Sequence, residues 1–168
     1  MIPENSSHAL DPKYLAVIIS SIIAVFGWLI SSYINTRTFK RNETSKLKDK
    51  ISSMVESFFD SLEDKIKTRG IKETELDDLI AGKLTLIELH LNHLDKKINI
   101  KLIPAEHINK IRSEPYDYLA SPNSDYKKKL TELKFNTLEL IEENYTEWYF
   151  MNSTKYHWVK LKKFISKK

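Results

Sequence analysis

The sequence predicts an all-α membrane protein, with a single N-terminal transmembrane helix followed by a small cytoplasmic helical bundle. Three observations carry this prediction. An uncharged apolar run lies near the N-terminus, apolar residues recur at helical spacing through the rest of the chain, and glycine occurs only 3 times in 168 residues. Scarce glycine combined with frequent leucine, isoleucine, lysine and glutamate favours helices over short strands and turns.

The predicted transmembrane helix covers residues 14–34. No charged residue occurs from Tyr14 to Thr36. A run of this length matches the roughly 20 residues that are needed to cross a hydrocarbon core of about 30 Å. Aromatic rings near its ends, those of Tyr14, Trp28 and Tyr33, suit the level of the lipid headgroups.

The charges on either side of this run predict its orientation. Residues 1–13 hold one lysine and two acidic residues, whereas a basic cluster that begins with Arg37, Lys40 and Arg41 follows the run. The positive-inside rule therefore places residues 1–13 outside as a short extracytoplasmic tail and the C-terminal part in the cytoplasm. The predicted location is the plasma or inner membrane, crossed once. A cleaved signal peptide is disfavoured because the leading segment is not basic.

Small residues form a stripe along one face of the predicted span. They recur at spacings of 4, 4, 3 and 4: Ala16, Ser20, Ala24, Gly27 and Ser31. Such stripes let helix backbones approach closely in lipid, so the pattern predicts association of the span with another membrane helix or with itself. The alternative is that small residues are simply frequent in membrane spans.

The segment 35–46 is predicted to be a basic juxtamembrane stalk, either as a continuation of the membrane helix or as a short linker. The bundle is then expected over residues 47–152. Its first helix has one apolar face, formed by Leu47, Ile51, Met54, Val55, Phe58, Phe59, Leu62 and Ile66. Gly70 is expected to end this helix.

A second helix is expected from about Lys72, with Gly82 as a candidate interruption. One face recurs at spacings of 4, 4, 3, 4, 3 and 4: Leu76, Ile80, Leu84, Ile87, Leu91, Leu94 and Ile98. The opposite side carries Leu79, Leu86 and Leu89. A helix that is apolar on two sides lies in the middle of a bundle or contributes to an interface, so these three leucines are the predicted partner interface.

Proline and turn residues divide the rest of the bundle. Pro104 is expected to open a short helix over about 105–113, and Pro115 and Pro122 to bracket a loop. A long helix then follows from about residue 125 to 152. Its acidic face, formed by Glu139, Glu142, Glu143 and Glu147, is expected to be solvated.

The C-terminal segment 153–168 contains six lysines and no acidic residue. As a helix it would be basic and amphipathic, which is typical of segments that lie on an anionic membrane surface. The predicted membrane-surface residues are Trp158, Lys160, Leu161, Lys162, Lys163, Phe164 and Ile165. Two alternatives remain open. The apolar face packs on the bundle, or the lysines and aromatic rings bind nucleic acid, which a net charge of only +4 does not favour.

No catalytic residue, cofactor or metal is predicted. The chain has no cysteine, and its three glycines are too few and too far apart for a phosphate-binding loop. His90 and His93 are three residues apart on the second helix, but they point in different directions on a helical wheel. These features argue against an enzyme.

The predicted function is that of a non-enzymatic, membrane-anchored interaction or regulatory module. It would recruit a protein partner, or assemble with itself, at the inner surface of the lipid bilayer. The alternative is a small membrane-perturbing effector of the toxin or host-defence type, which acts by oligomerisation of its transmembrane helix.

Overall fold

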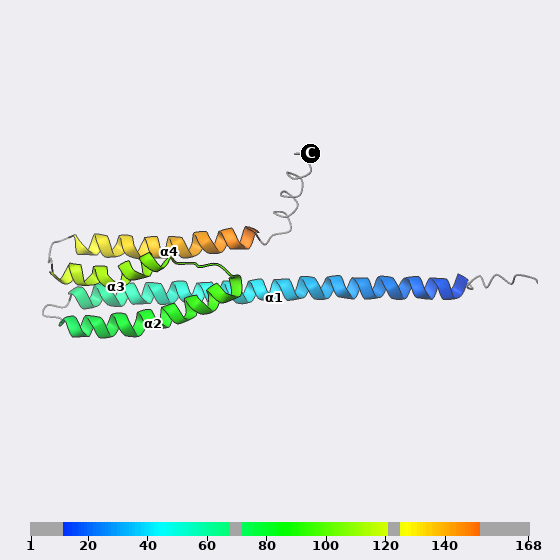
Figure 1. Cartoon of the computed structure of the whole chain (residues 1–168), viewed down its shortest axis with the longest axis horizontal. Helices are drawn as coiled ribbons and strands as arrows, with labels where there is room; N and C mark the ends of the chain where they lie inside the picture. Colours follow the sequence, from blue (N-terminus) through cyan, green and yellow to red (C-terminus); the bar gives the residue numbers. More distant parts are fainter. Residues whose placement is uncertain (1–11, 68–71, 121–124, 152–168) are drawn as a thin grey trace, which may run out of the picture. The chain divides into compact units, whose positions relative to one another are not determined.

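The computed structural model describes residues 12–67, 72–120 and 125–151. These residues form four α-helices and no strand: α1 (Pro12–Lys67), α2 (Glu73–Ile98), α3 (Ala105–Ala120) and α4 (Tyr126–Met151) (Figure 1). The all-α prediction is therefore confirmed. The chain divides into two compact units, Met1–Asn42 and Glu43–Lys168, which we call the N-terminal unit and the core unit.

The described part of the N-terminal unit is helical throughout. Its large apolar side chains between Tyr14 and Ile34 expose 47% to 68% of their surface, and none is buried within the chain. The stretch is long and apolar enough to cross a membrane. The predicted stalk, residues 35–46, is also helical, so the helix continues where a linker was the alternative.

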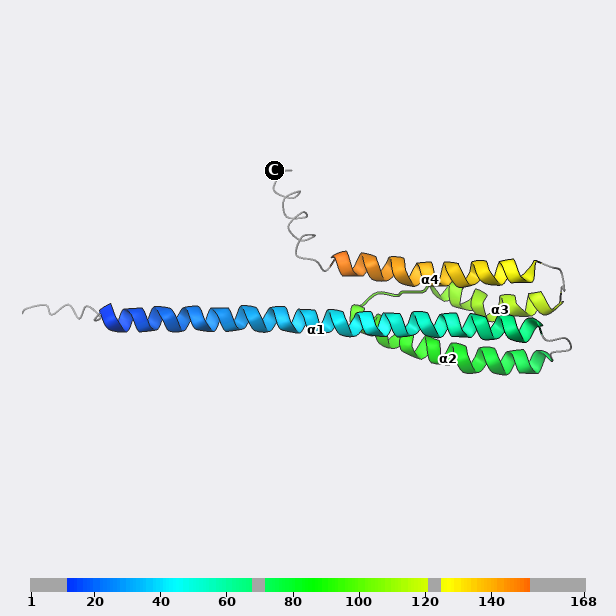
Figure 2. The same ribbon diagram turned by 180° about the vertical axis from the view of Figure 1, so that it is seen from behind.

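In the core unit, the part of α1 from Glu43 onward lies beside α2, α3 and α4 (Figures 1 and 2). Consecutive helices run antiparallel, and polar contacts join them in a closed ring. These contacts are Lys83 with Ser61 at 2.5 Å, Arg112 with Glu88 at 2.6 Å, His107 with Thr137 at 2.8 Å, and Lys134 with Asp60 at 2.7 Å.

The four helices share one hydrophobic core. All seven residues of the predicted apolar face of α2 are buried, which confirms that face. The predicted face at residues 47–66 is also confirmed, with Phe58 and Phe59 packed edge to face at a ring distance of 5.3 Å. Burying each large apolar side chain contributes about 1.5–3 kcal/mol relative to leaving it in water.

The predicted loop at Pro115 is wrong, because α3 continues through this residue to Ala120. A proline inside a helix removes one backbone hydrogen bond and tends to kink the helix. Here Pro115 is buried, as are Ile111 and Tyr118 one turn to either side. Packing of this face in the core therefore outweighs the local preference of proline.

Gly82 does not interrupt α2, which runs without a break from Glu73 to Ile98. A glycine inside a helix costs about 1 kcal/mol relative to alanine. The neighbouring Ile80 and Leu84 are both only 2% exposed, so core contacts hold the helix on either side of Gly82.

The connection between α2 and α3 is held by side chains from two helices. Asn99 adopts the left-handed conformation with φ 58°, and its N–H donates to the carbonyl oxygen of Asp95 at 2.7 Å. The N–H of the buried Leu102 donates to Asp95 Oδ1 at 3.1 Å. The carbonyl oxygen of Leu102 accepts a hydrogen bond from Asn144 Nδ2 at 2.7 Å. Both backbone groups of Leu102 are thus satisfied without regular secondary structure.

Candidate interaction surfaces

The predicted partner interface lies on the side of α2 that faces away from the core. Leu86 and Leu89 expose 53% and 61% of their surface. Leu79 is half-buried and packs against the core. Two of the three predicted leucines are therefore left uncovered by the residues that the structure describes. Gly82 lies between them and Leu79 in sequence, and a Cβ added to it would meet nothing within 4 Å.

The predicted small-residue stripe is exposed along its whole length on α1, from Ala16 to Ser31. The hydroxyl of Ser20 donates to the carbonyl oxygen of Val17 at 2.9 Å, so this polar group is satisfied within its own helix. A Cβ added to Gly27 would meet nothing within 4 Å. The stripe thus has room for a second helix against it.

The residues that predict topology follow the apolar stretch on the same helix. Arg37, Lys40 and Arg41 all lie in α1. Their role in orientation stays a prediction. The predicted membrane-surface residues between Trp158 and Ile165 lie outside the described residues, and their role also stays a prediction.

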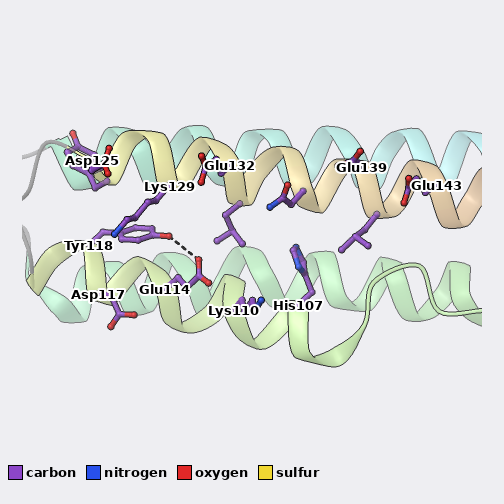
Figure 3. A pocket seen from close by; sticks show the side chains of 14 residues that line it. His107, Lys110, Glu114, Asp117, Tyr118, Asp125, Lys129, Glu132, Glu139 and Glu143 are labelled. Atoms are coloured by element: carbon purple, nitrogen blue, oxygen red, sulfur yellow. Dashed lines mark hydrogen bonds between the residues drawn. The ribbon is translucent and has the colours of Figure 1, made fainter.

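A groove of about 860 Å³ lies between α3 and α4, and the sequence did not indicate it (Figure 3). We call it the α3–α4 groove. The apolar part of its lining includes Leu133, which is buried, and Leu140, which is half-buried. Its charged lining is unbalanced, with two lysines and six carboxylates: Lys110, Lys129, Glu114, Asp117, Asp125, Glu132, Glu139 and Glu143.

Within the described part of the chain, none of the six groove carboxylates forms an ion pair. Glu114 accepts a hydrogen bond from the Tyr118 hydroxyl at 3.0 Å. The other five form no ion pair with any residue that the structure describes. By contrast, Glu142, on the same helix, pairs with Lys48 of α1 at 2.6 Å. The groove therefore concentrates uncompensated negative charge.

Burial and nearby negative charge both raise the pKa of the Tyr118 hydroxyl. Burial is the main cause that raises the pKa of its hydroxyl, followed by the hydrogen bond to Glu114. The charges of Asp117 and Glu132 raise the pKa further. In Figure 3, Lys129 reaches from α4 toward Tyr118.

His107 points from α3 toward α4 in the same groove (Figure 3). Its Nε2 lies 2.8 Å from Thr137 Oγ1, and the Thr137 hydroxyl donates to the carbonyl oxygen of Leu133 at 2.6 Å. Since that hydroxyl proton is already used, His107 Nε2–H is the donor to Thr137. Burial lowers the pKa of His107, and the charge of Lys110 lowers it further.

The groove can therefore offer negative charge, hydrogen-bond acceptors and apolar side chains. Among the described residues, no group of three or more histidine, aspartate or glutamate side chains is placed to hold a metal ion. His90 is half-buried and His93 is exposed, in line with the different directions expected for them.

The sequence contained only part of the signal for this groove. Thr137 lies four residues from both Leu133 and Ile141, and its place in the apolar register could have indicated a buried hydroxyl. Glu139 and Glu143 were expected on a solvated face, which is consistent with their exposure. Their position beside α3 depends on how the two helices pair, which spacing within one helix does not determine.

No protein-family model, curated protein or solved structure matches the chain, and its function is therefore inferred from its own residues.

Proposed function

We propose that this protein is a non-enzymatic interaction module anchored in the membrane. The apolar stretch of α1 spans the bilayer once, and the core unit forms a four-helix bundle in the cytoplasm. The bundle recruits a protein partner, or a second copy, through the outer face of α2. The observation that carries this proposal is the exposure of Leu86 and Leu89 on a helix whose opposite face is fully buried.

The anchor is supported by the exposure of its side chains. In water, a continuous surface of large apolar residues such as that from Tyr14 to Ile34 would favour aggregation. In a bilayer the same surface is solvated by lipid, and the helix satisfies its own backbone hydrogen bonds. Arg37, Lys40 and Arg41 then favour a cytoplasmic location for the core unit.

The partner face is supported by spacing as well as by exposure. Leu79, Gly82, Leu86 and Leu89 follow one another at intervals of 3, 4 and 3, which is the spacing of a helix–helix contact. Leu86 and Leu89 offer the apolar contact, while Gly82 leaves open space for close approach. The matching partner is an amphipathic helix that presents an apolar stripe.

The test is purification of the full chain in mild detergent, followed by mass measurement of the complex. We expect the wild type to carry an equimolar partner or a second copy, and Leu86→Asp/Leu89→Asp to lose it by at least tenfold. The control is Phe135→Asp, because Phe135 is 63% exposed but lies on α4. A wild type that purifies alone as a monomer, or a double variant that keeps its partner, would overturn the proposal.

A second candidate is the membrane-perturbing effector, favoured by the exposed small-residue stripe and the open space at Gly27. In this case the spans associate in the bilayer through the stripe. Overexpression should then be toxic, and Gly27→Leu should remove the toxicity because a large side chain keeps the helices apart. Val25→Leu, a change off the stripe, should leave the toxicity unchanged. Harmless overexpression of the wild type would exclude this candidate.

A further inference from the structure

We propose that the α3–α4 groove is the docking surface for the chain's own basic C-terminal segment, residues 152–168. The occupant is thus an amphipathic, lysine-rich segment that is covalently attached to the helix that forms one wall of the groove. This inference is independent of the partner face on α2.

Charge complementarity is the first argument. The groove presents six carboxylates against two lysines, although the whole chain carries a net charge of +4. Residues 152–168 contain six lysines and no acidic residue. Some carboxylates elsewhere in the core unit pair across helices, as Asp60 does with Lys134 and Glu88 with Arg112. The groove thus has an excess of negative charge, and the segment supplies charge of the opposite sign.

The apolar part of the groove is the second argument. Leu133 and Leu140 lie among the charged side chains that line it. The segment places Trp158, Leu161 and Phe164 at spacings of 3, so one face of a helix would present these side chains with lysines around it. A segment that combines apolar and cationic side chains therefore matches a groove whose lining combines Leu133 and Leu140 with an excess of carboxylates.

The attachment point is the third argument. The groove follows α4 from Asp125, which directly precedes its first residue, to Glu143, a length of about 27 Å at 1.5 Å per residue. The helix ends at Met151, about 12 Å beyond Glu143. Seventeen residues reach about 25 Å as a helix, so a helical segment that folds back from Met151 covers about 13 Å of the groove, the half nearest to Glu143.

Covalent attachment makes modest contacts sufficient. A segment tethered next to its site acts at an effective concentration in the millimolar range. The exposed ion pairs that hold it are individually weak and are screened by salt. Docking is therefore reversible.

The first experiment uses the full chain in nanodiscs of zwitterionic lipid, with zero-length carbodiimide crosslinking and mass spectrometry. We expect lysines 160, 162 and 163 to link to Glu139 or Glu143 within one chain. Glu56 and Asp78, which are exposed on α1 and α2, are the reference carboxylates. Crosslinks that are absent from the groove, equally frequent at the reference carboxylates, or formed only between isotopically distinct copies would overturn the proposal.

The second experiment measures chymotrypsin cleavage after Trp158 and Phe164 in the same nanodiscs. We expect Glu139→Lys/Glu143→Lys to raise the cleavage rate about tenfold, and the matched control Glu56→Lys/Asp78→Lys to leave it unchanged. Reversal on the segment alone, Lys162→Glu/Lys163→Glu, should have the same effect without touching the core helices. Combining this reversal with the groove reversal should restore protection.

The charge swap makes the outcome decisive. Failure of the groove reversal to increase cleavage, or failure of the combined swap to restore protection, would overturn the proposal. Anionic lipid provides the remaining comparison. Protection that requires anionic lipid and ignores the groove reversal would mean that the bilayer, and not the groove, holds the segment.

Discussion

The side-chain oxygens of Thr44 and Tyr145 lie 3.2 Å apart, both residues are buried, and their hydrogen bond joins α1 to α4 across 101 positions of the sequence. The Tyr145 ring also packs on Trp148 at 5.4 Å, and Lys48 Nζ lies 5.7 Å from the ring centre. Burial alone would lower the pKa of Lys48, but hydrogen bonds to Glu142 and Asp49 outweigh it and raise the pKa.

Removal of the Tyr145 hydroxyl should weaken the contact between α1 and α4. We expect Tyr145→Phe to lower the free energy of unfolding by about 1 kcal/mol, because one buried hydrogen bond is lost while the ring still packs. The measurement is guanidinium unfolding of the full chain in mild detergent, followed by circular dichroism. Tyr126→Phe is the control and should change stability by less than about 0.5 kcal/mol. Equal effects of the two changes would contradict this role.

The two faces of α2 should respond differently to the same truncation. Leu84 is 2% exposed and Leu86 is 53% exposed, two residues apart. We expect Leu84→Ala to cost about 2–5 kcal/mol through lost burial and a cavity. Leu86→Ala should stay within about 0.5 kcal/mol in the same unfolding measurement. A large loss of stability from Leu86→Ala would show that Leu86 is covered within the chain and would weaken the partner face.

The left-handed conformation of Asn99 predicts which residues are accepted there. Glycine adopts a positive φ without strain, asparagine tolerates it, and a β-branched residue does not. We expect Asn99→Gly to change stability by only a few tenths of a kcal/mol and Asn99→Val to cost about 1–2 kcal/mol. Thermal unfolding of both variants tests this, and a Val variant as stable as the Gly variant would contradict the conformation.

His107 should make stability depend on pH. Its folded-state pKa lies below the ordinary value of 6.5, chiefly because of burial, so the unfolded chain binds the proton first as the pH falls. The contribution is therefore complete above about pH 6.5 and is lost as the pH falls below it. Between pH 7.5 and 5.5 we expect a smaller decrease in Tm for His107→Gln than for the wild type.

The exposed His93 provides the matched control for this measurement. His93→Gln should retain the pH dependence of the wild type. If the wild type and His107→Gln lose the same number of degrees on acidification, His107 does not titrate in the way that its surroundings indicate.

The apolar faces were predictable from the sequence because helical spacing determines which side chains share a side. The face from Leu76 to Ile98 is buried at every predicted position. Pro115 was predicted incorrectly because local preference favours a loop there, whereas the buried Ile111 and Tyr118 keep α3 helical. Tertiary packing of this kind is not contained in the spacing of one segment.

The groove could not be predicted from the sequence without knowing how α3 pairs with α4. Glu142 and Glu143 are neighbours in sequence, yet Glu142 pairs with Lys48 of α1 while Glu143 lines the groove. The 100° step between consecutive helical residues separates their directions, but only the positions of the neighbouring helices decide what each one meets. The same holds for the contact between His107 and Thr137.

The two backbone hydrogen bonds of Leu102 constrain how this protein can evolve. The side chains of Asp95 and Asn144, on two different helices, satisfy the N–H and the carbonyl oxygen of a single buried residue. Position 102 needs only an apolar side chain of suitable size. Loss of the side chain of Asp95 or Asn144, by contrast, leaves a buried backbone group of Leu102 without its hydrogen bond. In related chains, position 95 should therefore retain a hydrogen-bond acceptor and position 144 a donor, while residue 102 exchanges among leucine, isoleucine and methionine.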